Sequence, residues 1–135
     1  MIKIVCGEKG RGKTKHMLEL ANKQVSKSNG SVIFIDKSED KIYDLNNEIR
    51  LIDITQYPIK NQVGFIGFIS GLLAGNHDID CIFIDSLLNT STTDNIDSIL
   101  RRLNELSKDV EFVVSISLSK EHIPDSYKDK IIVSL

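Results

Sequence analysis

The sequence predicts an α/β fold, a three-layer αβα sandwich around a mainly parallel sheet of five strands. Short, continuously apolar runs alternate along the chain with longer segments of helical periodicity, which calls for a parallel sheet with helices on both faces. The first apolar run leads directly into a glycine-rich segment that opens a helix. The chain has 135 residues and no linker-like composition, so we expect one domain, residues 1–135.

The first two strands flank the first helix. Residues 2–6 and 31–36 are apolar runs, and the four consecutive apolar residues of the second are typical of a strand covered on both faces. Between them, residues 13–28 predict a helix that ends at Asn29-Gly30. Its apolar residues recur at helical spacing: Met17, Leu18, Ala21 and Val25.

The middle of the chain is less regular. Residues 39–47 indicate a short helix or a turn, and residues 48–54 are compatible with a further strand. Residues 58–74 predict a helix that begins at Pro58. One side of this helix is a stripe of small residues, for which we expect tight packing on the sheet, with a subunit interface as the alternative. The stripe comprises Gly64, Gly67, Gly71 and Ala74.

The last third of the chain supplies three strands and one helix. Apolar runs predict strands at residues 80–85, 111–117 and 130–134. Thr93 or Asp94 is a suitable cap for a helix that runs to residue 108. Its apolar residues form one face: Ile96, Ile99, Leu100, Leu103 and Leu106.

Composition and charge narrow the classes of function. The net charge of −2 gives no basic excess, so binding of nucleic acid is not indicated beyond a local patch. The uncharged residues 61–76 are too short and too rich in glycine for a membrane span. Cys6 and Cys81 lie in apolar runs and are interpreted as core residues, not as a disulfide or a metal site. We expect a cytoplasmic protein without a secretory signal.

The most informative segment is residues 7–14, Gly-Glu-Lys-Gly-Arg-Gly-Lys-Thr, which fits the phosphate-binding pattern G-x-x-x-x-G-K-[ST]. Glycines let the backbone approach phosphates closely, at the positive end of a helix. Lys13 is expected to reach the β- and γ-phosphates of a nucleotide, and Thr14 to place its hydroxyl on Mg²⁺. The expected nucleotide-binding residues are Gly7, Glu8, Lys9, Gly10, Arg11, Gly12, Lys13, Thr14 and Lys15. The segment resembles the P-loop of the P-loop NTPase superfamily.

Asp85 ends the apolar strand at residues 80–85, so it is expected at the same edge of the sheet as the P-loop. We predict that it holds Mg²⁺ together with Thr14; an Asp that caps a turn is the alternative. Many P-loop ATPases carry a catalytic Glu next, but here the residue is Ser86, whose pKa is far too high for a water-activating base. Glu39 and Asp36, which follow the second strand, are the candidates for that role, and solvated loop acids are the alternative.

The residues Asp85-Ser86-Leu87-Leu88, after four apolar residues, are similar to the Walker B segment of RecA-type recombinases and hexameric helicases. That group carries its catalytic Glu at the end of the strand after the P-loop helix, which implies Glu39 here. The resemblance also implies that another strand separates the P-loop strand from the Walker B strand, in the order 5-1-4-3-2 along a five-stranded P-loop NTPase sheet. The chain is shorter than those motors, and it has neither a basic glycine-rich DNA-binding loop nor a Gln at the end of the fourth strand. Serines stand there instead: Ser115, Ser117 and Ser119.

The expected function is Mg²⁺-dependent ATP binding, with ATPase activity in which Lys13 and Glu39 are catalytic. ATP is preferred to GTP because the fourth strand lacks an Asn/Thr-Lys-x-Asp segment. The main alternative is a nucleotide-binding switch or partner subunit that does not hydrolyse ATP. A small-metabolite or nucleoside kinase ranks third, because the chain has only four arginines and no arginine-rich lid. A homo-oligomer or a protein partner stays open, with Arg101 or Arg102 as a possible arginine finger toward a neighbouring subunit.

Overall fold

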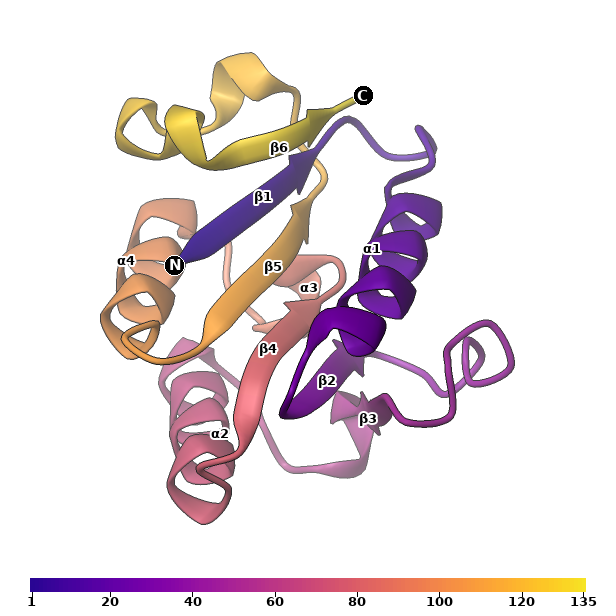
Figure 1. Cartoon of the computed structure of the whole chain (residues 1–135). Coiled ribbons are helices and arrows are strands. Elements are labelled where there is room, and N and C mark those ends of the chain that lie inside the picture. Colours follow the sequence, from indigo (N-terminus) through magenta and orange to yellow (C-terminus); the bar gives the residue numbers. More distant parts are fainter.

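A computed structural model describes all residues, 1–135, and contains one parallel sheet of six strands in the order β3-β2-β4-β5-β1-β6 (Figure 1). Every neighbouring pair of strands in this sheet is parallel. The strands are β1 (Ile2–Cys6), β2 (Ser31–Asp36), β3 (Arg50–Asp53), β4 (Ile79–Ile84), β5 (Glu111–Ile116) and β6 (Ile131–Ser134). The α/β class and the parallel sheet predicted from the sequence are confirmed.

Helices lie on both faces of the sheet. The helix α1 covers one face, whereas α2 and α4 pack side by side on the other (Figure 1). The helices are α1 (Lys13–Lys27), α2 (Gln62–Gly75), α3 (Leu87–Thr90) and α4 (Ile96–Leu106), with 3-10 turns η1 (Ile54–Gln56), η2 (Lys120–His122) and η3 (Asp125–Lys130). None of the helices combines the length and apolar character needed to cross a lipid bilayer.

The prediction of five strands in the order 5-1-4-3-2 is wrong. The sheet has six strands, because Arg50–Asp53 forms β3 and pairs with β2 at the edge of the sheet. This strand has only four residues, and among them Ile52 alone is buried. An edge strand of this length carries too short an apolar run to separate it from a turn.

The central strands are apolar on both faces because helices cover both. Alternate residues of β2 and β4 point to opposite faces, so Val32 and Phe34 pack toward α1 while Ile33 and Ile35 pack toward α2 and α4. On the α1 face, the rings of Phe34 and Phe83 stack with centroids 6.1 Å apart. Burial of each such side chain contributes about 2–3 kcal/mol, which fixes the register of the strands that end at the site.

Several helix boundaries differ from the predicted ones. The helix α2 begins at Gln62, not at Pro58, because the Asn61 side chain accepts a hydrogen bond of 2.8 Å from the Gly64 N–H. Asn95 caps α4 in the same way, in place of Thr93 or Asp94. Residues 39–47 form turns, which is one of the two expected alternatives, whereas the short helix α3 was not predicted.

The small-residue stripe of α2 does not pack on the sheet, contrary to the expectation from the sequence. Gly64, Gly67, Gly71 and Ala74 are exposed, and a Cβ added at Gly67 or Gly71 would meet nothing within 4 Å. The bulky residues Phe65 and Ile69 form the buried side of the helix instead. Large apolar side chains bury more surface than glycine, so they decide which side of a helix faces the core.

Candidate functional site

The glycine-rich loop (residues 7–14) connects β1 to α1 at the carboxyl edge of the sheet. Gly10 and Gly12 adopt left-handed backbone conformations, with φ of 84° and 92°. Residues with a Cβ rarely adopt such values, so these two positions require glycine to keep the loop in its present shape. Gly12 directly precedes the first turn of α1, whose free N–H groups give this end of the helix a partial positive charge.

Lys13 is the first residue of α1 and is only 8% exposed. Its Nζ donates a hydrogen bond of 3.0 Å to the backbone carbonyl of Glu8, across the loop. Burial lowers the pKa of Lys13, although the nearby Asp85 carboxylate acts in the opposite direction. The ammonium group therefore lies within the loop, with no carboxylate in direct contact.

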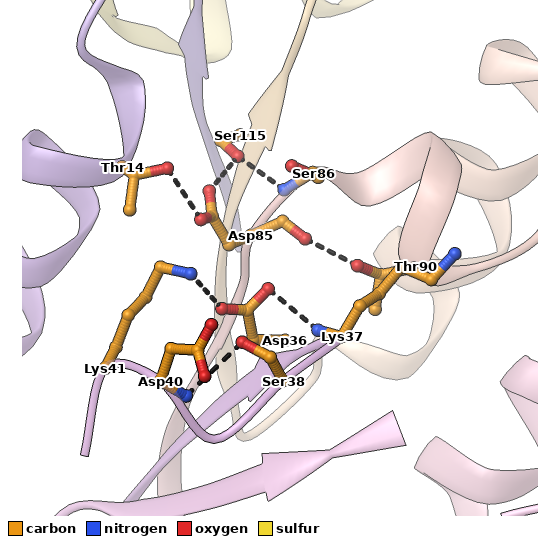
Figure 2. A network of polar contacts seen from close by, with 10 residues as sticks. All are labelled: Thr14, Asp36, Lys37, Ser38, Asp40, Lys41, Asp85, Ser86, Thr90 and Ser115. Carbon is orange, nitrogen blue, oxygen red and sulfur yellow. Dashed lines mark hydrogen bonds and ion pairs between the residues drawn. The ribbon is translucent and has the colours of Figure 1, made fainter. Parts of the chain in front are cut away.

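Asp85 follows β4 and is the most buried carboxylate of the site, with an exposed fraction of 2%. Its Oδ2 accepts a hydrogen bond of 2.9 Å from the Thr14 hydroxyl, and its Oδ1 accepts one of 2.5 Å from the Ser115 hydroxyl (Figure 2). The Ser115 oxygen in turn accepts the Ser86 N–H at 2.7 Å. Both carboxylate oxygens are therefore held by neutral hydroxyl groups, and no cation touches them.

Asp36 ends β2, the strand next to β4, and is 6% exposed. It lies beside Asp85, because Ile35 pairs with Ile84 and the Asp85 N–H donates to the Ile35 carbonyl at 3.1 Å. Strand alternation directs both carboxylates to the α1 face. Two buried carboxylates therefore end neighbouring strands on the same side of the sheet.

The Asp36 carboxylate, unlike that of Asp85, has a cation bound to it. Lys41 Nζ contacts Asp36 Oδ2 at 2.5 Å, and the Lys37 backbone N–H donates to Oδ1 at 2.7 Å (Figure 2). Burial by itself would lower the pKa of Lys41. The pKa is raised nevertheless, because the hydrogen bond to Asp36 and the charges of Asp36, Asp85 and Asp40 outweigh the burial. Lys41 thus stays protonated, in contact with the Asp36 carboxylate.

The other predicted site residues lie further out. Glu39 is exposed in the turn after β2 and makes no side-chain hydrogen bond or ion pair. The structure therefore brings Asp36 into the cluster, and not Glu39. Arg101 and Arg102 are on α4, which packs on the face opposite α1. Four charged residues of the predicted nucleotide-binding set are exposed: Glu8, Lys9, Arg11 and Lys15.

A cavity of about 360 Å³ opens between the glycine-rich loop and the end of β4, and no hydrophobic residue lines it. Its lining residues are Lys9, Gly10, Gly12, Lys13, Thr14, Asp85, Ser86, Asn89 and Ser117. Sequence reasoning assigned no role to Asn89, since α3 was not predicted, nor to Ser115, although it occupies the end of the predicted fourth strand. The cavity offers cationic and hydroxyl groups on one side and a carboxylate on the other.

The backbone around α3 is strained next to this cavity. Ser86 and Thr92, which flank the helix, have positive φ values of 52° and 54°. For a β-branched residue such as Thr92 this conformation is a clear outlier, and strain of this kind concentrates at functional sites. The Ser115 hydroxyl helps to hold Ser86 in place through its hydrogen bond to the Ser86 N–H.

The donor set decides which metal ion the site suits. The structure has no group of three or more His, Cys, Asp and Glu side chains arranged to hold a metal ion. The neighbouring oxygens of Thr14 and Asp85 are hard ligands, the kind that Mg²⁺ uses when substrate phosphates complete its coordination. The residues present therefore fit Mg²⁺ bound together with phosphates, and do not fit an all-protein cage.

Comparison with models of known protein families finds no match, and comparison with curated proteins finds no related sequence.

Proposed function

We infer that this protein binds a nucleoside triphosphate, with ATP as the preferred candidate, together with Mg²⁺ at the carboxyl edge of the sheet. The observation that carries the inference is the 2.9 Å contact between the Thr14 hydroxyl and the Asp85 carboxylate, next to a loop of the G-x-x-x-x-G-K-[ST] pattern. A loop that matched the pattern only by chance would not be expected to place its final Thr against a buried Asp that ends another strand. The protein would then be a P-loop NTPase with a RecA-type core.

The residues have distinct roles in this proposal. The loop backbone and the helix α1 N-terminus bind the phosphates, and Lys13 exchanges the Glu8 carbonyl for the β- and γ-phosphate oxygens. Thr14 and Asp85 would hold Mg²⁺, which supplies neutralisation of the phosphate charge when it is bound. Ser115 keeps the Asp85 carboxylate oriented toward Thr14. The free, buried thiols of Cys6 and Cys81 fit a reducing compartment such as the cytoplasm.

Hydrolysis of the bound ATP is the proposed reaction. Water attacks the γ-phosphorus, the bond to the β–γ bridging oxygen breaks, and ADP and phosphate leave. Two carboxylates are candidates for orienting the attacking water. The family resemblance implies Glu39, whereas Asp36 ends the strand next to that of Asp85. Asp36 orients water only after Lys41 has left it, because Lys41 occupies one of its oxygens.

The Asp36–Lys41 pair also favours a second candidate function. A carboxylate neutralised by its own lysine is a poor base, so the pair is what a nucleotide-dependent switch without useful hydrolysis would need. Phosphate release separates the two candidates. If ATP turnover is lost in Asp36→Asn but kept in Glu39→Gln, Asp36 is the carboxylate that orients the attacking water. The reverse result would give this role to Glu39. Binding without turnover would favour the switch.

Binding itself is tested by isothermal titration calorimetry with ATP, in Mg²⁺ and in EDTA. We expect Lys13→Ala to weaken binding about a hundredfold or more, since a buried cation that contacts phosphate is lost. Lys27→Ala is the matched control, because Lys27 is an exposed lysine at the far end of the same helix. No binding of ATP or GTP by the unmodified chain would refute the proposed function.

A further inference from the structure

The segment of residues 37–43, which follows β2, is tied to the rest of the fold by one side chain. Its backbone hydrogen bonds are local, such as that from the Ile42 N–H to the Glu39 carbonyl at 3.1 Å. The hydrogen bonds and ion pairs that leave the segment go to the two residues that flank it: the Lys41 side chain and the Lys37 N–H bind Asp36, and the Asp44 N–H donates to the Lys41 carbonyl (Figure 2). Lys41 is therefore the one residue of the segment whose side chain ties it to the buried end of β2.

The residues that come next are anchored in a different way. Leu45 and Ile49 are buried in the core on the α1 face. Asn22 of α1 donates to the Asp44 carbonyl at 2.9 Å and accepts from the Asn46 N–H at 2.7 Å. Release of Lys41 would free residues 37–43 while residues 44–49 stay on α1. The boundary between a movable and a fixed part of the chain thus falls directly after Tyr43.

A bound triphosphate would compete with Asp36 for Lys41. The Lys41 ammonium contacts the Asp36 carboxylate, and the charges of Asp85 and Asp40 also raise its pKa, so it already lies in the negative field at the end of β4. A terminal phosphate bound beside Asp85 adds about 1.5 to 2 negative charges and three strong acceptor oxygens. A diphosphate at the same loop lacks this group, so it leaves the pair with Asp36 undisturbed.

We propose that Lys41 is a sensor of the terminal phosphate, which it binds in exchange for Asp36 when a nucleoside triphosphate occupies the site. The exchange moves residues 37–43 and uncovers the Asp36 carboxylate. Lys41 thereby gives the protein a preference for triphosphate over diphosphate. This inference rests on the proposed function, and it adds a second phosphate-binding lysine outside the glycine-rich loop.

The segment contains a residue, Tyr43, that can be replaced by a fluorescent probe. Tyr43 is 96% exposed and Ile42 is 52% exposed, and the chain contains no tryptophan. Tyr43→Trp therefore introduces a single tryptophan whose emission and anisotropy follow the segment without disturbing buried contacts. The measurement compares Mg²⁺-ATP with Mg²⁺-ADP, while calorimetry on the same variant gives the affinity for each nucleotide.

Three proteins that carry Tyr43→Trp make the test decisive: the single variant, the same variant with Lys41→Met, and the same variant with Lys37→Met. Lys37 is a suitable control because it is an exposed lysine of the same segment whose side chain forms no ion pair. We expect Mg²⁺-ATP to change the tryptophan signal, and Mg²⁺-ADP to change it far less. Lys41→Met should abolish the change and reduce the ATP-over-ADP preference about tenfold, the scale of one charge-assisted contact. Lys37→Met should leave both unchanged.

The outcomes separate the two proposals. If ATP binds and the tryptophan signal does not change, or changes equally in Lys41→Met, the sensor role is refuted and the proposed function stands. If the ATP-over-ADP preference survives Lys41→Met, Lys41 does not contact the terminal phosphate. If no nucleotide binds at all, the proposed function fails and the sensor role fails with it.

Discussion

Asp36 and Asp85 end neighbouring strands, point to the same face of the sheet and are almost fully buried, but their negative charges are balanced in different ways. Asp36 has a lysine ammonium at 2.5 Å. Asp85 has two hydroxyl groups, those of Thr14 and Ser115, and no cation in contact. One carboxylate is paired with a cation from within the chain, whereas the other is held by hydroxyl groups alone.

The difference indicates which carboxylate is available to a ligand. Burying a charged carboxylate without a partner is costly, so a fold keeps such a group only where something compensates for it. The hydroxyl groups of Thr14 and Ser115 donate hydrogen bonds to Asp85 and hold its carboxylate toward Thr14, but they supply no positive charge. In the proposed function, Mg²⁺ is the cation that binds Asp85, whereas at Asp36 an external cation would have to displace Lys41.

The largest expected effect comes from the same substitution at the two positions. Asp85→Asn should abolish the Mg²⁺-dependent part of ATP binding, a loss of about a hundredfold or about 2.7 kcal/mol, because the charged ligand is removed. Asp36→Asn should act in the opposite direction and bind Mg²⁺-ATP at least as tightly as the unmodified chain, because it frees Lys41 for the phosphates. Calorimetry with and without Mg²⁺ measures both. Equal losses in the two variants would show that the carboxylates are not distinguished in this way.

The second prediction concerns stability without nucleotide. Lys41→Met should destabilise the fold by about 1–3 kcal/mol, because it leaves the buried Asp36 carboxylate without its cation. Lys41→Met with Asp36→Asn should recover much of this loss, giving a coupling energy of about 1–2 kcal/mol in a double-mutant cycle. Urea unfolding of the two single variants and the double variant provides the values. If the two substitutions change the free energy of unfolding additively, the interaction between Lys41 and Asp36 does not contribute to stability.

A smaller effect is expected at Ser115. Ser115→Ala removes one hydroxyl from Asp85 and leaves the Ser86 N–H without its acceptor. We expect a loss of about 1 kcal/mol in stability and a several-fold loss in affinity for Mg²⁺-ATP. Ser126→Ala is the matched control, since Ser126 is an exposed serine that does not line the cavity. An unchanged affinity in Ser115→Ala would show that Thr14 alone orients the carboxylate.

The sequence was sufficient to predict the contact on which the site depends. The G-x-x-x-x-G-K-[ST] pattern and an apolar strand ending in Asp predicted that Thr14 and Asp85 lie at the same edge of the sheet and hold Mg²⁺ together; the Thr14 hydroxyl and the Asp85 carboxylate are 2.9 Å apart there, and their role as Mg²⁺ ligands stays a prediction. Both residues are fixed to the same edge by chain direction, because parallel strands end on one side of a sheet. Predictions of this kind need only the direction of each strand, and not its side-chain packing.

The choice between Asp36 and Glu39 could not be made from the sequence. Asp36 is the last residue of β2 and Glu39 lies three residues later, and which acid is buried depends on the residue at which the strand ends and the chain turns away. The buried side of α2 was equally undetermined, because apolar residues surround this uncharged helix and its periodicity marks no single face. Lys41, the partner of Asp36, lies in a segment of turns. Sequence periodicity does not predict where the side chains of such a segment lie in the fold.

The smallest expected effect concerns Asp80, the carboxylate at the other end of β4. Like Asp85 it is held by neutral donors, the Ser28 hydroxyl and the Gly30 N–H, but it is exposed. The Ser28 hydroxyl first, and then the Gly30 N–H, lower the pKa of Asp80. A carboxyl whose pKa is lower in the folded state stabilises the fold above its ordinary pKa, and this contribution is lost as the pH falls through the folded value. Asp80→Asn should therefore reduce the difference in urea stability between about pH 7 and about pH 3 slightly, since water screens an exposed carboxylate at this end of the strand. If Asp80→Asn leaves the pH dependence of stability unchanged, the hydrogen bonds from Ser28 and Gly30 do not stabilise the ionised carboxylate of Asp80.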